Sequence, residues 1–168
     1  MIETKRLILR PYNIDDIDDL YKIISDKETM KYFDQPYTYE QTIRWVNWSI
    51  DHYKRYGFSF FAVILKETGQ FIGNCGLTLQ TIDNEILPEI GYHIHKDYMR
   101  QGYGSEAAIA VKDWAFLNTE YNDLYSYMSK DNEASVKVAI KNGMKHIKDY
   151  EEDNKVYSVY KITRADLL

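Results

Sequence analysis

The hydrophobic and polar positions of this chain change period along the sequence, and each change marks an expected element. Residues Arg6–Tyr12, "RLILRPY", alternate apolar and polar side chains at period two, which is typical of a half-buried strand. Apolar residues at helical spacing follow behind Asn13, with Asp16 three residues on, and predict a capped helix. The expected buried stripe of this helix consists of Ile14, Ile17, Leu20, Tyr21 and Ile24.

A second helix and a hairpin are predicted next. The second helix begins after Thr38 and ends at Gly57, with apolar residues at helical spacing in between. The runs "FSFFAVIL" and "QFIGNCGLTLQ" flank the turn "KETGQ" and predict two antiparallel strands. A further strand is expected in "PEIGYHIH", Pro88–His95, and it leads into a helix from Gly102 to about Asn118.

The last third of the chain continues this alternation. "LYSYMS" predicts a strand, and "NEASVKVAIKNG" predicts a helix closed by Gly143. "MKHIKDY" and "KVYSVYKIT" predict two antiparallel strands around the turn "EEDN". The order of elements predicts a single α/β (α+β) domain over residues 1–168, with a central mixed, mostly antiparallel sheet of about seven strands and about four flanking helices. Edge strands at the C-terminal end of such a sheet could support a homodimer.

Composition and charge narrow the class of protein. The single cysteine, Cys75, excludes an intrachain disulfide framework and fits a reducing compartment. The longest apolar run, Phe58–Leu65, is far shorter than the roughly 20 residues that span a bilayer, so we expect a cytoplasmic protein with no membrane partner. A net charge of −5 without a Lys/Arg cluster disfavours nucleic acid as a partner and is compatible with a cationic substrate such as an amine.

Two glycines one residue apart open the third predicted helix, in "MRQGYGSEAA", Met99–Ala108. A strand ending near Tyr98 and a tight turn would leave several helix N-terminal amides unpaired and facing one way. Gly102 and Gly104 lack the Cβ atoms that would hold a ligand away from those amides. The pattern favours a phosphate or pyrophosphate ligand; the alternative is that the glycines only make a tight turn and a close helix–sheet contact.

Two familiar phosphate-binding loops are excluded. The chain has no G-x-x-x-x-G-K-[ST] motif, and Ala107 stands where G-x-G-x-x-G requires its third glycine. The preceding strand lies in the middle of the chain with antiparallel-looking neighbours, not at the start of a parallel βαβ unit. A protein that binds ATP or NAD through this loop is therefore disfavoured.

The segment "PEIGYHIHKDYMRQGYGSEAA" resembles the acyl-CoA signature of the GNAT superfamily of N-acyltransferases. The resemblance extends to "ETKRLILRPYNIDD" and "NEASVKVAIKNGM" and is closest to the branch of the ribosomal-protein alanine N-acetyltransferases. It implies that the loop [QR]-x-x-G-x-[GA], here Met99–Gly104, binds the CoA pyrophosphate through its amides. Met99 departs from the Gln or Arg of the first position. The implied donor-binding residues are Arg100, which could supply a charge to a phosphate, and Gln101, Gly102, Tyr103, Gly104 and Ser105.

The strand before this loop carries the expected chemistry. Acetyl transfer needs a hydrogen-bond donor for the thioester oxygen, a base for the ammonium and a proton for the leaving thiolate. Strand alternation puts Glu89, Gly91, His93 and His95 on one face. By resemblance, the main chain of Tyr92 and Ile94 pairs with the pantetheine arm of CoA.

Glu89 is the candidate base, directly or through a water, and partial burial would raise its pKa toward that role. The alternative is an ion pair between Glu89 and a Lys or Arg of a neighbouring strand. His93 and His95 share a face, but neither Cys75 nor the nearby acidic residues complete a zinc ligand set with them, so no metal is expected. His93 is expected to contact the substrate, and His95 to be a surface histidine.

The last predicted helix supplies the remaining matches. Asp131 or Asn132 caps it, and the resemblance implies that Asn132 hydrogen-bonds pantetheine. Many relatives have a tyrosine seven residues later that protonates the thiolate, but this chain has Ala139 there. The branch that the chain resembles has a serine three residues after this Asn, and Ser135, one helical turn after Asn132, is by this resemblance the candidate acid; the alternative is a serine on a solvent-facing turn. Lys141 matches a commonly basic position that reaches the nucleotide end of CoA.

The acceptor cleft is expected between the first two helices and the late strands. Its candidate wall residues are Tyr37, Trp45, Trp48 and Tyr157; the alternative is a place in the core, where an aromatic residue of an amphipathic helix lies more often. The predicted function is that of an acetyl-CoA-dependent N-acetyltransferase acting by direct transfer on a primary amine, either a protein N-terminus or a small amine. The alternative, favoured by Met99 and Ala139, is a catalytically inactive acyl-CoA-binding sensor or interaction domain.

Overall fold

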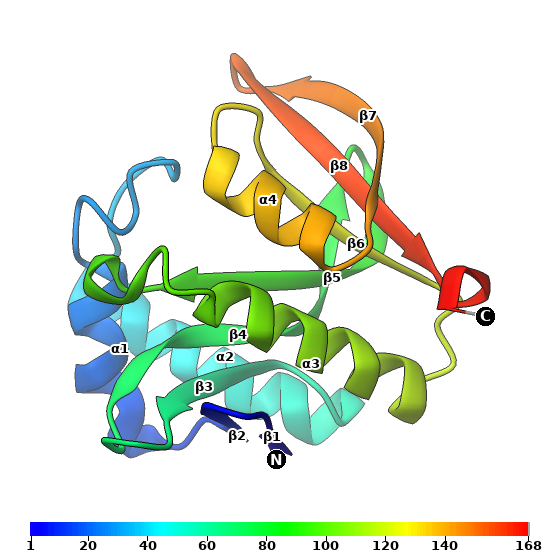
Figure 1. The fold of residues 1–168 in the computed structure, drawn as a ribbon. Coiled ribbons are helices and arrows are strands. Elements are labelled where there is room, and N and C mark those ends of the chain that lie inside the picture. Colours follow the sequence, from blue (N-terminus) through cyan, green and yellow to red (C-terminus); the bar gives the residue numbers. More distant parts are fainter. Residues whose placement is uncertain (168) are drawn as a thin grey trace.

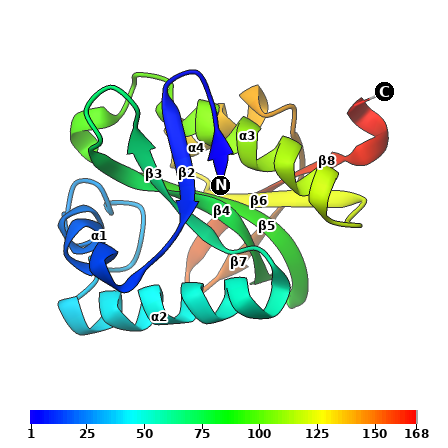
Figure 2. The same cartoon turned by 90° about the horizontal axis from the view of Figure 1, so that it is seen from below.

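The computed structural model describes residues 1–167 as one twisted eight-stranded sheet with two helices on each face (Figures 1 and 2). The strands are β1 (Ile2–Glu3), β2 (Leu7–Pro11), β3 (Phe60–Leu65), β4 (Phe71–Ile82), β5 (Glu85–Ile94), β6 (Asp123–Ser129), β7 (Lys145–Glu152) and β8 (Lys155–Thr163). The helices are α1 (Ile17–Ile24), α2 (Tyr39–Tyr56), α3 (Tyr103–Asn118) and α4 (Glu133–Lys141). Short 3₁₀ turns lie at η1 (Ile14–Asp16), η2 (Lys96–Tyr98) and η3 (Arg164–Leu167).

The strand order is β1-β2-β3-β4-β5-β6-β8-β7, so β7 forms one edge of the sheet. Every neighbouring pair is antiparallel except β5 and β6, which run parallel and share a single register position, Glu89 opposite Tyr125. At this junction the Ser126 hydroxyl donates to the Ile90 carbonyl over 2.7 Å. Toward Ile94, no described strand pairs with the β6-facing edge of β5, and its backbone groups there are left for another partner.

The helices enclose two apolar cores, one on each face of the sheet (Figure 2). The core beneath α3 and α4 includes Phe61, Leu77 and Ile90, all fully buried. The core beneath α1 and α2 includes Leu20, Ile24 and Val46. Each such side chain contributes roughly 1.5–3 kcal/mol on burial, so the two cores hold both helix pairs against the central strands.

The predicted helix boundaries are confirmed for the second and last helices. The Thr38 hydroxyl accepts from the Gln41 amide at the start of α2, and Gly57 ends the helix in the left-handed conformation at φ 77°. Gly143 adopts φ 81° just after α4. Among the residues described, no helix is both long and apolar enough to cross a membrane.

Three sequence expectations need correction. Asn13 does begin the first helical segment, but as the 3₁₀ turn η1, whose tighter winding leaves Ile14 54% exposed, and Ile23 joins the buried stripe instead. The strand before the glycine loop ends at Ile94, not near Tyr98, because the turn η2 intervenes. The sheet has an additional strand, β1, whose two residues are too few to show alternation.

Candidate active site

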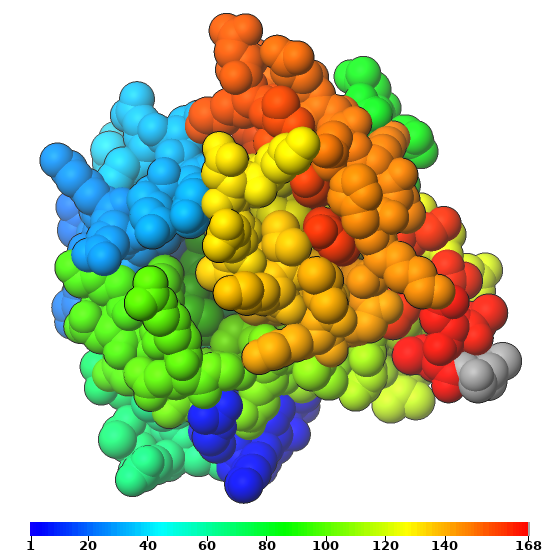
Figure 3. Space-filling model, turned by 45° about the horizontal axis from the view of Figure 1, so that its top comes forward, coloured from blue at the N-terminus to red at the C-terminus, as the bar shows by residue number. Residues whose placement is uncertain are grey.

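A cleft of about 660 Å³ opens where β5 and β6 part (Figure 3). Its walls come from the segment before α2, from α2 itself, from the adjacent faces of β5 and β6, from the start of α4 and from the β7–β8 hairpin. The side chains predicted for the chemistry and for the acceptor all line it: Glu89, His93, Ser135, Tyr37, Trp45, Trp48 and Tyr157. Residues from two helices, six strands and the loop before α2 therefore converge on one concave site, which is the expected form of a small-molecule site.

Glu89 lies on β5 at the floor of the cleft and is only 6% exposed. Burial raises the pKa of its carboxyl to about 8. The expected alternative, an ion pair, is not found: no Lys or Arg of residues 1–167 forms a salt bridge with Glu89. An unpaired buried carboxyl with a pKa near neutrality is suited to accept and release a proton.

Gly91 makes room for this carboxyl. A Cβ at Gly91 would lie 2.8 Å from Glu89 Oε2 and 3.3 Å from Phe60 Cε1. The Glu89 side chain therefore leans along the strand over the Gly91 backbone, as the shared face predicted. Glycine at position 91 allows the carboxyl to occupy that place.

His93 lies further along the same face, among the rings of Phe33, Trp45 and Phe60. Its Nδ1 is 2.9 Å from Oδ1 of the fully buried Asn74. A carboxamide oxygen only accepts, so Nδ1 donates, and the Nε2 of the neutral ring keeps a lone pair. Burial lowers the pKa of His93 to about 4, which keeps the ring neutral at physiological pH. Sequence reasoning missed Asn74, because nothing local to its position marks it as the partner of a residue on the next strand.

His95 lies outside the cleft lining, where its Nδ1 accepts from the Asp97 amide. No group of three or more His, Cys, Asp or Glu side chains within residues 1–167 is arranged to hold a metal ion. Cys75 is fully buried.

The start of α4 is fixed from two sides. Asn132, not Asp131, is the N-cap, and its side chain accepts from the Ser135 amide over 3.2 Å. The Tyr92 hydroxyl donates to the Ser135 carbonyl over 2.8 Å. These two bonds hold Ser135 on the cleft wall, across from the strand that carries Glu89.

The acceptor side of the cleft is aromatic on both walls. On one wall the ring of Tyr37 lies 5.0 Å from that of Trp45, and on the other Tyr157 stacks on Tyr150 at 5.4 Å. Tyr127 of β6 packs beside Tyr157, at 5.9 Å between ring centroids, and was missed by sequence reasoning. An ion pair between Lys155 and Asp34 joins the two walls at the rim.

The glycine loop lies outside this cleft, at the start of α3. Gly102 is the N-cap with φ 81°, and no side chain caps the helix, in contrast to α2 and α4. Arg100 also adopts a left-handed conformation, with φ 62°. The first amides of α3 therefore lack intrahelical acceptors and stand open to a ligand. A Cβ at Gly104 would make ordinary contacts with Ile94 and Val138, so Gly104 lies in the seam between β5 and α4.

The remaining predicted residue, Lys141, is exposed at the far end of α4 and does not reach the cleft.

Comparisons with known proteins bear on the family and the fold of the chain. The sequence profile of the family described as Acetyltransferase (GNAT) domain matches residues 6–145. The chain is 34% identical to YkkB, an uncharacterized protein of Bacillus subtilis (strain 168), over 94% of this chain and 92% of YkkB. It is 32% identical to the uncharacterized N-acetyltransferase p20 of Bacillus licheniformis, over 80% and 76% of the two chains. The fold also matches RimL, a ribosomal L7/L12 α-N-protein acetyltransferase in complex with coenzyme A, with a TM-score of 0.79, 17% identity and 95% coverage of both chains.

Proposed function

Because the chain belongs to the GNAT acetyltransferase family, we propose that it transfers the acetyl group of acetyl-CoA to a primary amine by direct attack. The observation that carries the proposal is the unpaired carboxyl of Glu89, held at the floor of the cleft with a pKa of about 8. An amine acceptor is supported by the N-acetyltransferase p20, and a CoA donor by the complex of RimL. The acceptor is either a peptide N-terminus or a small amine.

The donor would lie across the seam between β5 and α4. The free edge of β5 at Tyr92 and Ile94 offers backbone groups to the pantetheine arm, as an added strand would use them. The uncapped amides from Gln101 to Ser105 offer hydrogen bonds to the pyrophosphate, and the helix dipole favours its charge. Asn132 caps α4 and also lines the cleft, so its side chain is placed to contact pantetheine there.

The transfer uses three side chains of the cleft. His93 Nε2 accepts a hydrogen bond from the amine and orients its nitrogen. Glu89 takes the proton that the amine must lose, the nitrogen bonds to the acetyl carbon, and the carbon–sulfur bond breaks. The Ser135 hydroxyl donates to the departing thiolate. Holding both substrates in one cleft supplies several kcal/mol of the barrier by proximity alone.

The test is thermal unfolding with acetyl-CoA, CoA, ATP and NAD in parallel, followed by an amine panel read by thiol release. A ligand at about 100 times its dissociation constant adds roughly 2.7 kcal/mol of stability. We expect acetyl-CoA and CoA alone to raise the midpoint, and at least one amine to release thiol. A shift with CoA but no turnover over a broad panel would favour a donor-binding sensor instead. A shift with ATP or NAD alone would overturn the assignment of the loop.

A further inference from the structure

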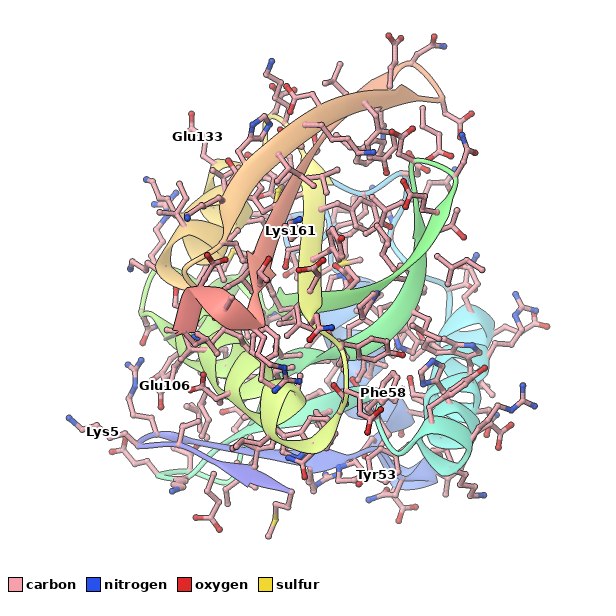
Figure 4. All side chains as sticks on the ribbon, turned by 90° about the vertical axis from the view of Figure 1, so that its right-hand side faces the viewer. Lys5, Tyr53, Phe58, Glu106, Glu133 and Lys161 are labelled. Carbon is pink, nitrogen blue, oxygen red and sulfur yellow. The ribbon has the colours of Figure 1, made fainter. Side chains whose placement is uncertain are left out.

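We propose that Arg6 is a positioning residue for the acetyl donor: it aims the Gly102 amide toward the pyrophosphate and neutralises Glu106 beside it. The inference rests on the proposed function, because it concerns the loop that would hold the donor. Arg6 comes from the turn between β1 and β2, about a hundred residues before the loop in sequence. Figure 4 shows Glu106 on α3 near the N-terminal strands, with Lys5 pointing away into solvent.

The guanidinium of Arg6 contacts three residues of the glycine loop and the first turn of α3. Its Nε donates to Glu106 Oε2 over 2.6 Å, and its Nη1 donates to the Gln101 carbonyl over 2.9 Å. Its Cζ lies 4.3 Å from the centre of the Tyr103 ring, in a cation–π contact. A Cβ at Gly102 would lie 3.3 Å from its Nη2, so the glycine also leaves space for the guanidinium.

The hydrogen bond from Arg6 to the Gln101 carbonyl also fixes the direction of the Gly102 N–H, because the two groups belong to one peptide unit. In a trans peptide the carbonyl of one residue and the N–H of the next point in opposite directions. The peptide between Gln101 and Gly102 is trans, so fixing the Gln101 oxygen on Arg6 turns the Gly102 N–H away from the N-terminal strands. The opposite side of α3 is the one that faces β5 and α4, where the pantetheine edge and the cleft lie (Figure 1).

Charge is the second contribution. Glu106 sits in the first turn of α3, where a bare carboxylate would repel a pyrophosphate. Burial raises the pKa of Glu106, but hydrogen bonds from the Thr4 hydroxyl and from Arg6 outweigh burial, and the pKa lies below its usual value. Glu106 is therefore ionised at neutral pH, and Arg6 supplies the compensating charge.

The experiment compares acetyl-CoA with acetyl-pantetheine, which lacks the pyrophosphate, in the wild type, Arg6→Gln and the control Lys5→Gln. We expect Arg6→Gln to raise the KM for acetyl-CoA and the Kd for CoA by about ten- to hundredfold, because a charge-assisted contact is lost. The kcat/KM for acetyl-pantetheine should change less than about threefold, and Lys5→Gln should match the wild type with both donors. Arg6→Lys should recover little, because an ammonium cannot bridge Glu106 and the Gln101 carbonyl as the planar fork does.

The double variant Arg6→Gln/Glu106→Gln tests the charge contribution. It should bind CoA several-fold more tightly than Arg6→Gln alone, since no uncompensated carboxylate remains. Equal losses with acetyl-CoA and acetyl-pantetheine would show a general structural role and overturn the inference. So would unchanged binding of CoA by Arg6→Gln. A wild type that neither binds CoA nor discriminates between the donors would instead overturn the proposed function itself.

Discussion

Replacing Glu89 with glutamine tests the central chemical claim. With a pKa of about 8, the fraction of Glu89 that is ionised is about 1% at pH 6, about 9% at pH 7 and about 91% at pH 9. If the carboxylate is the base, wild-type activity contains this fraction as a factor, whereas Glu89→Gln activity does not. General-base catalysis contributes about 10²–10⁴-fold, so the variant should fall by that order at pH 9.

The assay is the ratio of wild-type to variant kcat/KM, measured by thiol release from about pH 6 to pH 9. The ionisation of the acceptor amine cancels in this ratio, because both enzymes use the same amine. We expect the ratio to rise by about ninetyfold across the range, with its midpoint near pH 8.

The matched control is Glu152→Gln, which removes an exposed carboxylate from the lining of the same cleft. The ratio of wild-type to Glu152→Gln kcat/KM should be independent of pH. A flat ratio for Glu89→Gln, or a midpoint near the ordinary 4.5 of glutamate, would refute the assignment of Glu89 as base.

Three further predictions follow from the same site. The pKa of Glu89 is higher in the folded state than in the unfolded chain, so its contribution to stability is complete below about pH 4.5 and is lost as the pH rises through about 8. In urea unfolding, the free energy of unfolding of the wild type should fall by up to about 5 kcal/mol relative to that of Glu89→Gln over this window. Parallel pH profiles of the two proteins would contradict this prediction. Gly91→Ala should displace the Glu89 carboxyl and lower kcat by about tenfold or more, while the free energy of unfolding changes by about 1 kcal/mol. Full activity of this variant would show that the carboxyl does not act from its present place. His93→Phe should raise the KM for the amine but not for acetyl-CoA and should cost about 1–3 kcal/mol of stability, because Asn74 loses its donor; an unchanged amine KM would remove His93 from the acceptor site.

Local chemistry explains which parts of the fold could be predicted from sequence. The caps at Thr38 and Gly143 are properties of a few neighbouring residues, and both were predicted correctly. The face shared by Glu89 and Gly91 also follows from strand alternation alone. The exposure of Ile14 could not be read in this way, because a 3₁₀ turn and an α-helix place the same residue on different sides.

Contacts between distant segments account for what the sequence did not reveal. Asn74 and His93 meet only because β4 and β5 pair in a particular register, in which they are direct partners. Arg6 and Glu106 are 100 residues apart, and "TKRL" carries no local sign of that partner. The roles of Glu89, Ser135 and the glycine loop remain predictions, which the experiments above are designed to test.

The single register position between β5 and β6 also divides the chain into two assembly units. Residues 2–94 form an antiparallel half-sheet of five strands, and residues 123–163 form another of three. Beyond that position, side-chain contacts join the two parts: the Ser126 hydroxyl donates to the Ile90 carbonyl, and Lys148 and Lys155 form ion pairs with Asp83 and Asp34. Because backbone pairing between the two parts is limited to one position, we expect them to open locally at a lower free energy than the whole chain unfolds. A donor that hydrogen-bonds to both β5 and α4 would stabilise the association of the two parts, so the donor of the proposed reaction would also stabilise the folded chain.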